Sequence, residues 1–111
     1  MQISIIGLGR MGANMARRWA RGGVNVVAFD QSPEARASAI EANISAVASL
    51  AEAVTAQTSP RIVWLMLPSG EITESTIDAL LPMLAKGDLL VDGGNANYKD
   101  TQRRAVKANA F

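Results

Sequence analysis

The chain has 111 residues, of which 49% are hydrophobic and 19% are charged, and its formal net charge is +1. These values are typical of one globular domain with a single core, and the near-neutral charge gives no indication of a nucleic acid or an anionic membrane as partner. The chain contains no cysteine and no histidine, which excludes disulfides and removes the most common general base. No paired carboxylates, metal-ligand cluster or nucleophile–base pair can be assembled, so we expect neither a metal site nor a catalytic residue in this chain.

The sequence shows no sign of a segment for export or membrane insertion. Met1 leads almost directly into a strand-like apolar run, which leaves no room for a signal peptide. The longest strongly apolar run, residues 62–67, is far too short to span a bilayer. We therefore expect a cytoplasmic protein.

Short apolar runs alternate with helix-like segments along the chain. Strands are predicted over residues 2–6, 24–29, 44–46, 62–67 and 89–91. Helices are predicted over residues 11–21, 33–42, 49–57, 71–85 and 98–109, with an irregular or kinked end of the fourth helix at Pro82. Four of the strands are almost continuously apolar, as in parallel sheets that are covered on both faces. This alternation predicts an α/β fold of the Rossmann type, a doubly wound parallel sheet with strand order 3-2-1-4-5.

The first predicted strand runs directly into a glycine-rich turn. The turn reads Gly7-Leu8-Gly9-Arg10-Met11-Gly12, and a helix, a second strand and Asp30 follow it. This is the dinucleotide-binding fingerprint in its strand–turn–helix setting. Gly7 would permit the tight turn, Gly9 the close approach of a pyrophosphate, and Gly12 the close packing of helix on strand. The start of the helix would offer unpaired N–H groups and a positive dipole end to the phosphates.

Two questions about this turn stay open at the level of the sequence. The glycines could pack a helix against a strand without binding any ligand. Arg10 could add positive charge near the phosphates, or it could be a solvated residue of the first helical turn.

Asp30 lies at the end of the second predicted strand, where a carboxylate can accept hydrogen bonds from the adenosine ribose hydroxyls. Its negative charge would also repel the 2′-phosphate of NADP. Gln31 follows where an arginine would be needed to bind that phosphate, and the nearest cation, Arg36, lies about a turn into the next helix. The sequence therefore predicts NAD in preference to NADP. The alternative is that Asp30 only caps the helix that begins at Pro33, after Ser32.

Two more loops follow the fourth and fifth predicted strands. The first reads Leu67-Pro68-Ser69-Gly70, and the second reads Asp92-Gly93-Gly94-Asn95. In an open parallel sheet both lie at the carboxyl edge, where ligands bind. The amide of Asn95 could bind the nicotinamide ribose or a substrate hydroxyl there, although residues 93–95 could also form an ordinary turn. Trp64, in the middle of the fourth strand, is expected in the core.

Three segments together resemble the N-terminal coenzyme domain of the 6-phosphogluconate dehydrogenase (decarboxylating) family. They are residues 6–14, 63–71 and 91–95, which read IGLGRMGAN, VWLMLPSGE and VDGGN. The Asp-Gly-Gly-Asn sequence is the most specific, because the related β-hydroxyacid dehydrogenases usually carry an Asp-x-Ser-Thr sequence at that point. The resemblance implies an oxidoreductase of the pentose phosphate pathway, which oxidises 6-phosphogluconate at C3 and decarboxylates the product to ribulose 5-phosphate.

The resemblance also implies roles for individual residues. The implied cofactor-binding residues are Gly7, Leu8, Gly9, Arg10, Met11, Gly12, Asp30, Gln31, Ser32, Leu67, Pro68, Ser69 and Asn95. Asn95 would also bind the substrate. Many members carry Asn-Arg-Ser or Asn-Arg-Thr at the ribose segment and prefer NADP, whereas residues 30–32 read Asp-Gln-Ser, as in the NAD-preferring bacterial branch. Ala96 stands where many members have a serine, so a hydroxyl contact would be lost there.

The family's Ser-Gly-Gly substrate loop, its catalytic lysine and glutamate, and its helical dimerisation domain lie beyond the part that this chain matches. We therefore expect residues 1–111 to be a domain fragment, truncated before a sixth strand, that binds NAD weakly and is inactive alone. Its parent would be a homo-oligomer acting on 6-phosphogluconate, and the exposed fifth strand of the fragment could cause self-association. Two other interpretations stay open: the coenzyme domain of a β-hydroxyacid dehydrogenase, and a stand-alone NAD-binding regulatory module.

Overall fold

The computed structural model describes residues 2–67 and 71–93. In chain order its elements are β1 (Gln2–Ile6), α1 (Arg10–Arg21), β2 (Asn25–Phe29), α2 (Pro33–Glu41), β3 (Ser45–Ala46), α3 (Leu50–Thr55), β4 (Ile62–Leu65), α4 (Glu71–Leu80), the 3-10 helix η1 (Leu81–Met83) and β5 (Leu89–Asp92). The strands form one sheet in the order β3-β2-β1-β4-β5, and every neighbouring pair is parallel. The predicted fold class and strand order are confirmed.

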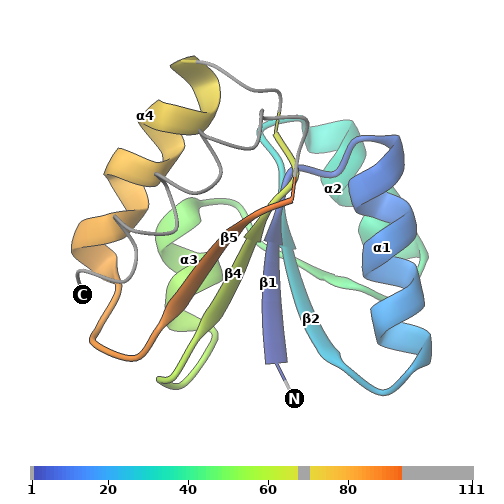
Figure 1. Ribbon diagram of the computed structural model, residues 1–111. Coiled ribbons are helices and arrows are strands. Elements are labelled where there is room, and N and C mark those ends of the chain that lie inside the picture. Colours follow the sequence, from blue (N-terminus) through green and yellow to red (C-terminus); the bar gives the residue numbers. More distant parts are fainter. Residues whose placement is uncertain (1, 68–70, 94–111) are drawn as a thin grey trace.

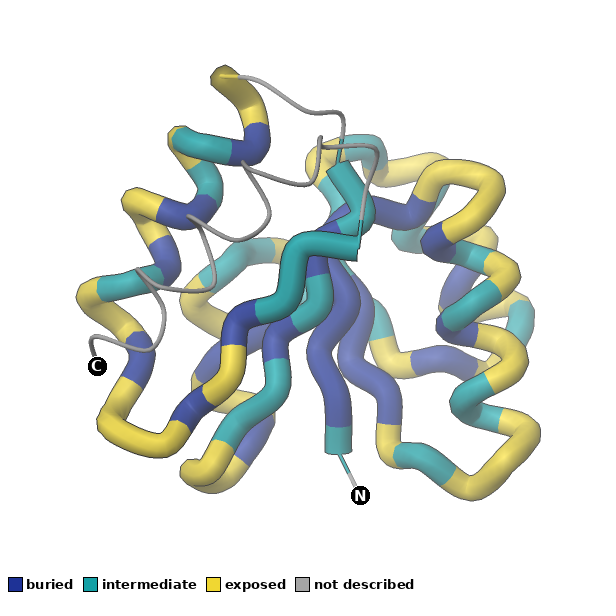
Figure 2. Tube along the Cα trace, in the orientation of Figure 1, coloured by how far each residue is buried: buried dark blue, intermediate teal, exposed yellow. Residues whose placement is uncertain are grey.

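The sheet separates two layers of helices (Figure 1). Helices α1 and α2 cover one face, and α3 and α4 cover the other. Alternate residues of β1 serve the two layers: Ile5 packs in a cluster with Ala16 of α1, and Ile6 packs in a second cluster with Ile77 of α4. Figure 2 shows the buried strands between helices whose outer sides are exposed. This two-sided burial explains why the strands read as apolar runs rather than as alternating patterns.

Element ends differ from the predicted ones by a few residues, for local reasons. β2 begins at Asn25 because the N–H of Val24 still donates to the carbonyl of Trp19, at 2.9 Å, in the turn after α1. The fourth helix, α4, ends at Leu80 and continues as the 3-10 helix η1, which contains Pro82. The predicted irregular end of this helix at Pro82 is therefore confirmed. α3 is shorter than predicted, and the predicted helix over residues 98–109 lies outside the described residues.

A polar network holds together the amino-terminal ends of β4 and β5, at the edge opposite the glycine turn. The buried carboxylate of Asp88 accepts hydrogen bonds from the hydroxyl of Ser59 at 2.6 Å, from the N–H of Ala85 at 2.8 Å, and from both the backbone and the guanidinium of Arg61. Burial on its own would raise the pKa of Asp88, but these hydrogen bonds outweigh it and lower the pKa to about 2. The network stabilises the sheet at a distance from the carboxyl edge.

Candidate dinucleotide-binding site

The turn between β1 and α1 requires two of its three glycines for steric reasons. Gly7 has a φ of +103°, which favours glycine, and a Cβ at this position would lie 2.5 Å from the carbonyl oxygen of Met66. A Cβ on Gly12 would lie 2.1 Å from the carbonyl oxygen of Gly7. The first turn of α1 therefore packs directly on the backbone of the glycine turn, with the end of β4 behind it.

Gly9 differs from the other two, because among the described residues no atom beyond Gly9 and its two chain neighbours lies within 4 Å of the position its Cβ would occupy. Its backbone is extended, with φ −64° and ψ −175°, which any residue can adopt. The open space lies beside the start of α1, where the first intrahelical hydrogen bond runs from the N–H of Ala13 to the carbonyl of Gly9 at 2.8 Å. The helix itself offers no acceptor to the N–H groups of residues 10–12. The arrangement leaves both room and donors for an anionic group.

Asp30 links the end of β2 to the glycine turn. One carboxylate oxygen accepts a hydrogen bond from the N–H of Leu8 at 2.7 Å, and the other accepts from the N–H of Ser32 at 2.8 Å. The N-cap of α2 is Ser32, whose hydroxyl oxygen accepts from the N–H of Ala35 at 3.3 Å. The alternative that Asp30 only caps this helix is therefore wrong. Each carboxylate oxygen has a second lone pair with which it can accept a ribose hydroxyl.

The guanidinium of Arg36 binds the backbone of the loop between β2 and α2. Its Nη1 donates to the carbonyl oxygen of Asp30 at 2.7 Å and to that of Gln31 at 3.3 Å. The nearest cation to the ribose segment is thus engaged with the backbone of the loop it stabilises. The sequence placed Arg36 near Asp30 but gave no signal of these contacts, which depend on the bend of the loop.

A cavity of about 260 Å³ opens at the carboxyl edge of the sheet, between the ends of β2 and β4. Its lining residues come from five parts of the fold: Ile6, Gly7, Phe29, Asp30, Gln31, Leu50, Leu67, Ile72 and Thr76. The structure thus brings the predicted residues Gly7, Asp30, Gln31 and Leu67 around one space. Sequence reasoning missed the apolar contributions of α3 and α4, and their only signal is an apolar residue in the first turn of each helix.

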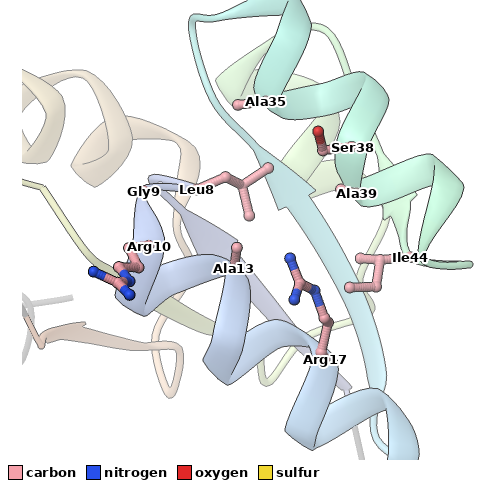
Figure 3. Close-up of a pocket in the computed structure, with 9 residues that line it drawn as sticks. All are labelled: Leu8, Gly9, Arg10, Ala13, Arg17, Ala35, Ser38, Ala39 and Ile44. Carbon is pink, nitrogen blue, oxygen red and sulfur yellow. The ribbon is translucent and has the colours of Figure 1, made fainter.

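A second cavity, of about 210 Å³, lies between α1 and α2 (Figure 3). Its floor is apolar, and Arg17 of α1 extends toward α2, on which Ser38 lies. Arg10 contributes at the mouth, but its exposed side chain points away from Ala13 and the cavity (Figure 3). An approach of Arg10 to a phosphate stays a prediction.

The two downstream loops are described only in part. Leu67 lines the cavity between β2 and β4, whereas the predicted contacts of Pro68, Ser69 and Asn95 lie outside the described residues. Gly93 continues the pairing of β5, because its N–H donates to the carbonyl of Leu65 at 2.8 Å. Within the described ranges, no cluster of acidic side chains could hold a metal ion, and no helix is both long and apolar enough to cross a membrane.

The five-stranded parallel sheet, its glycine turn and the carboxylate at the end of β2 define a dinucleotide-binding domain of the Rossmann type. The sequence matches the family described as the NAD binding domain of 6-phosphogluconate dehydrogenase over residues 2–110. The chain belongs to this family.

Named relatives agree with this assignment. The chain is 41% identical over 110 residues to a 6-phosphogluconate dehydrogenase of Haloferax volcanii, named NAD(+)-dependent and decarboxylating, and it is 44% identical over 107 residues to a decarboxylating 6-phosphogluconate dehydrogenase of Staphylococcus aureus. These alignments cover 99% and 93% of the chain, but only 37% and 23% of the two relatives. The chain therefore spans about a third of the first relative and about a quarter of the second.

Solved structures show the same fold. A 3-hydroxyisobutyrate dehydrogenase of Mycobacterium tuberculosis superposes with a TM-score of 0.87 and 28% identity, over 98% of this chain and 36% of that one. The 6-phosphogluconate dehydrogenase of Plasmodium falciparum superposes with a TM-score of 0.81 and 27% identity, over 94% of this chain and 24% of that one. The β-hydroxyacid dehydrogenases thus share the architecture, while the family match and the named relatives favour 6-phosphogluconate dehydrogenase.

Proposed function

We propose that this chain is the coenzyme-binding part of a decarboxylating 6-phosphogluconate dehydrogenase and that it prefers NAD to NADP. The pyrophosphate would lie in the open space at Gly9, against the N–H groups at the start of α1. The adenosine would extend toward the cavity between β2 and β4, which has an apolar wall and the carboxylate of Asp30 at its rim. When bound, the nicotinamide would accept a hydride from the substrate.

The preference for NAD rests on one observation, the position of the Asp30 carboxylate beside the N–H of Leu8. A ribose that binds there places its hydroxyls within reach of this carboxylate, and a 2′-phosphate would bring two negative charges together. Unit charges 4 Å apart interact by about 4 kcal/mol at an effective dielectric constant of 20. Even about a third of that energy is a tenfold difference in affinity. Arg36 offers little compensation, since it is engaged with the carbonyls of the loop.

The activity of the parent would use groups outside this chain. The family match and two named relatives support oxidation and decarboxylation of 6-phosphogluconate as the reaction. By the resemblance of its loop to that family, Asn95 would contribute a substrate contact. A β-hydroxyacid dehydrogenase is the second candidate for the parent protein, and the TM-score of 0.87 with 3-hydroxyisobutyrate dehydrogenase supports this candidate.

Calorimetric titration of the chain with NAD and NADP, at equal ionic strength, tests the coenzyme preference. We expect NAD to bind about tenfold more tightly. Equal or tighter binding of NADP would refute the preference.

Turnover assays with 6-phosphogluconate and with 3-hydroxyisobutyrate test whether the chain alone is inactive. We expect no turnover of either substrate. Tight NAD binding without further sequence would instead favour the stand-alone module.

A further inference from the structure

The order of the strands determines where the two halves of an extended dinucleotide can lie. β1 lies between β2 and β4 in the sheet. With the pyrophosphate at the start of α1 and the adenosine ribose at Asp30 beside β2, the nicotinamide half has to lie across β1, beside the carboxyl ends of β4 and β5. Among the described residues, Gly93 is the last one on that side.

The backbone at the end of β5 lies directly against an indole ring. A Cβ built on Gly93 would lie 2.2 Å from Nε1 and 2.6 Å from Cε2 of Trp64. On its other side, the N–H of Gly93 donates to the carbonyl of Leu65 at 2.8 Å. Gly93 is therefore held between a hydrogen bond to β4 and the pyrrole edge of the indole, and no side chain fits at this position.

The indole of Trp64 is itself held in place by α1. Its ring centroid lies 5.4 Å from that of Trp19, and the two ring planes meet at 77°, an edge-to-face contact. Across the described part of the chain, the buried Nε1 of Trp64 has no hydrogen-bond acceptor. The indole fills the space next to Gly93.

We infer that Trp64 is a positioning residue for the nicotinamide half of the coenzyme, because its indole determines where the backbone of Gly93 lies. This inference rests on the function proposed above. A change in the contact between Trp64 and Gly93 moves the end of β5, which borders the nicotinamide half. It leaves the adenosine ribose contact at Asp30 unchanged, because Asp30 follows β2, on the other side of β1.

Calorimetric titrations with NAD and with ADP separate the two halves, because ADP has the adenosine and the pyrophosphate but no nicotinamide nucleoside. We expect the unchanged chain to bind NAD more tightly than ADP. Gly93→Ala should weaken NAD binding by about tenfold and leave ADP binding within about twofold. Adding Trp64→Phe to Gly93→Ala should recover about threefold or more of the lost NAD affinity, because the smaller ring makes room for the methyl group.

Gly22→Ala is the matched control, since among the described residues a Cβ there meets only the carbonyls of Arg18 and Trp19, at ordinary distances of 3.6 and 3.5 Å. Both affinities should stay within about twofold of the unchanged chain. Should Gly93→Ala fail to fold, Trp64→Phe alone gives the test: NAD binding weakens by about threefold and ADP binding does not change.

Three results would overturn the inference: equal losses for NAD and ADP, a double variant no better than Gly93→Ala, or an unchanged NAD-to-ADP ratio in Trp64→Phe. An unchanged chain that binds ADP and NAD equally would also overturn it, while the proposed function would stand. A chain that binds neither ligand would overturn the proposed function itself.

Discussion

The carboxylate of Asp30 accepts a hydrogen bond from the backbone N–H of Leu8 at 2.7 Å, which ties the end of β2 to the middle of the glycine turn. The two residues are separated by all of α1, so this contact closes the β1–α1–β2 unit at the carboxyl edge. The same carboxylate is the group that we propose binds the adenosine ribose. A change at Asp30 therefore acts on the shape of the turn and on coenzyme choice at once.

Asp30→Asn should shift the coenzyme preference toward NADP. The amide removes the negative charge that repels a 2′-phosphate, and we expect the ratio of NADP to NAD affinity to rise about tenfold. One of the two hydrogen bonds to Leu8 and Ser32 becomes unfavourable, so the free energy of unfolding should fall by about 1 kcal/mol. Calorimetry and urea denaturation measure the two effects. Glu41→Gln, at the exposed end of α2, removes the same charge and should change neither; an unchanged ratio in Asp30→Asn would contradict the role given to its charge.

Gly9→Ala and Gly12→Ala should have different consequences although they lie three residues apart. Gly9→Ala places its methyl group in open space, so the domain should fold with nearly unchanged stability and lose NAD affinity by about tenfold or more. Gly12→Ala places a methyl group 2.1 Å from the carbonyl oxygen of Gly7, and the domain should lose about 1–3 kcal/mol of stability. Thermal unfolding and calorimetry on both variants check this. A Gly9→Ala variant that binds NAD normally would show that the pyrophosphate does not approach there.

Asp88 should make the stability of the domain depend on pH in the acid range. Its pKa in the folded state, about 2, is below the ordinary value of 3.8, so its stabilising contribution is present above about pH 4 and is lost as the pH falls toward 2. A shift of this size corresponds to about 2 kcal/mol. Urea denaturation of Asp88→Asn should show about that loss at pH 7 and a smaller difference from the unchanged chain at pH 2.5. Glu41→Gln again serves as the control. A difference that stays constant with pH would mean that the charge of Asp88 is not the cause.

The β5 strand should promote self-association of the isolated chain. Within residues 2–67 and 71–93, β5 pairs with β4 on one side only, and Leu89 is 44% exposed. Unpaired strand edges with apolar residues favour pairing between chains. We expect sedimentation velocity to show a concentration-dependent dimer and Leu89→Lys to suppress it, while Lys86→Gln, in the preceding turn, leaves it unchanged. A strictly monomeric profile at high concentration would argue against this interface.

The fold was largely predictable because its signals are local. Apolar runs for a sheet covered on both faces, and glycines or capping serines at helix ends, need no knowledge of distant contacts. Ser32 and Ser49 both cap the helices that the sequence suggested, each accepting from an N–H three residues later. The ends of the elements were predicted less accurately, since an end depends on which carbonyl accepts a hydrogen bond from a single N–H, as at Val24.

The candidate site was predictable at positions where only one type of residue meets a steric or electrostatic requirement. Gly7, Gly12 and Asp30 are of this kind, and the structure places all three around the predicted turn. The apolar wall from Leu50 and Ile72 was not predictable, because α3 and α4 bring these residues to one cavity beside the end of β2 only in the folded chain. Trp64 was expected in the core; it packs against a core cluster, is half-buried, and has its indole against Gly93, a contact the sequence did not predict.

The contact between Trp19 and Trp64 has a spectroscopic consequence, because these are the only two tryptophans in the chain. All indole absorption and emission originate from one place, where α1 meets β4. The indole bands of the near-ultraviolet circular dichroism therefore report one packing event, and their loss on denaturation marks the detachment of α1 from the sheet. Stopped-flow refolding followed at these wavelengths would time the moment at which α1 reaches its final position.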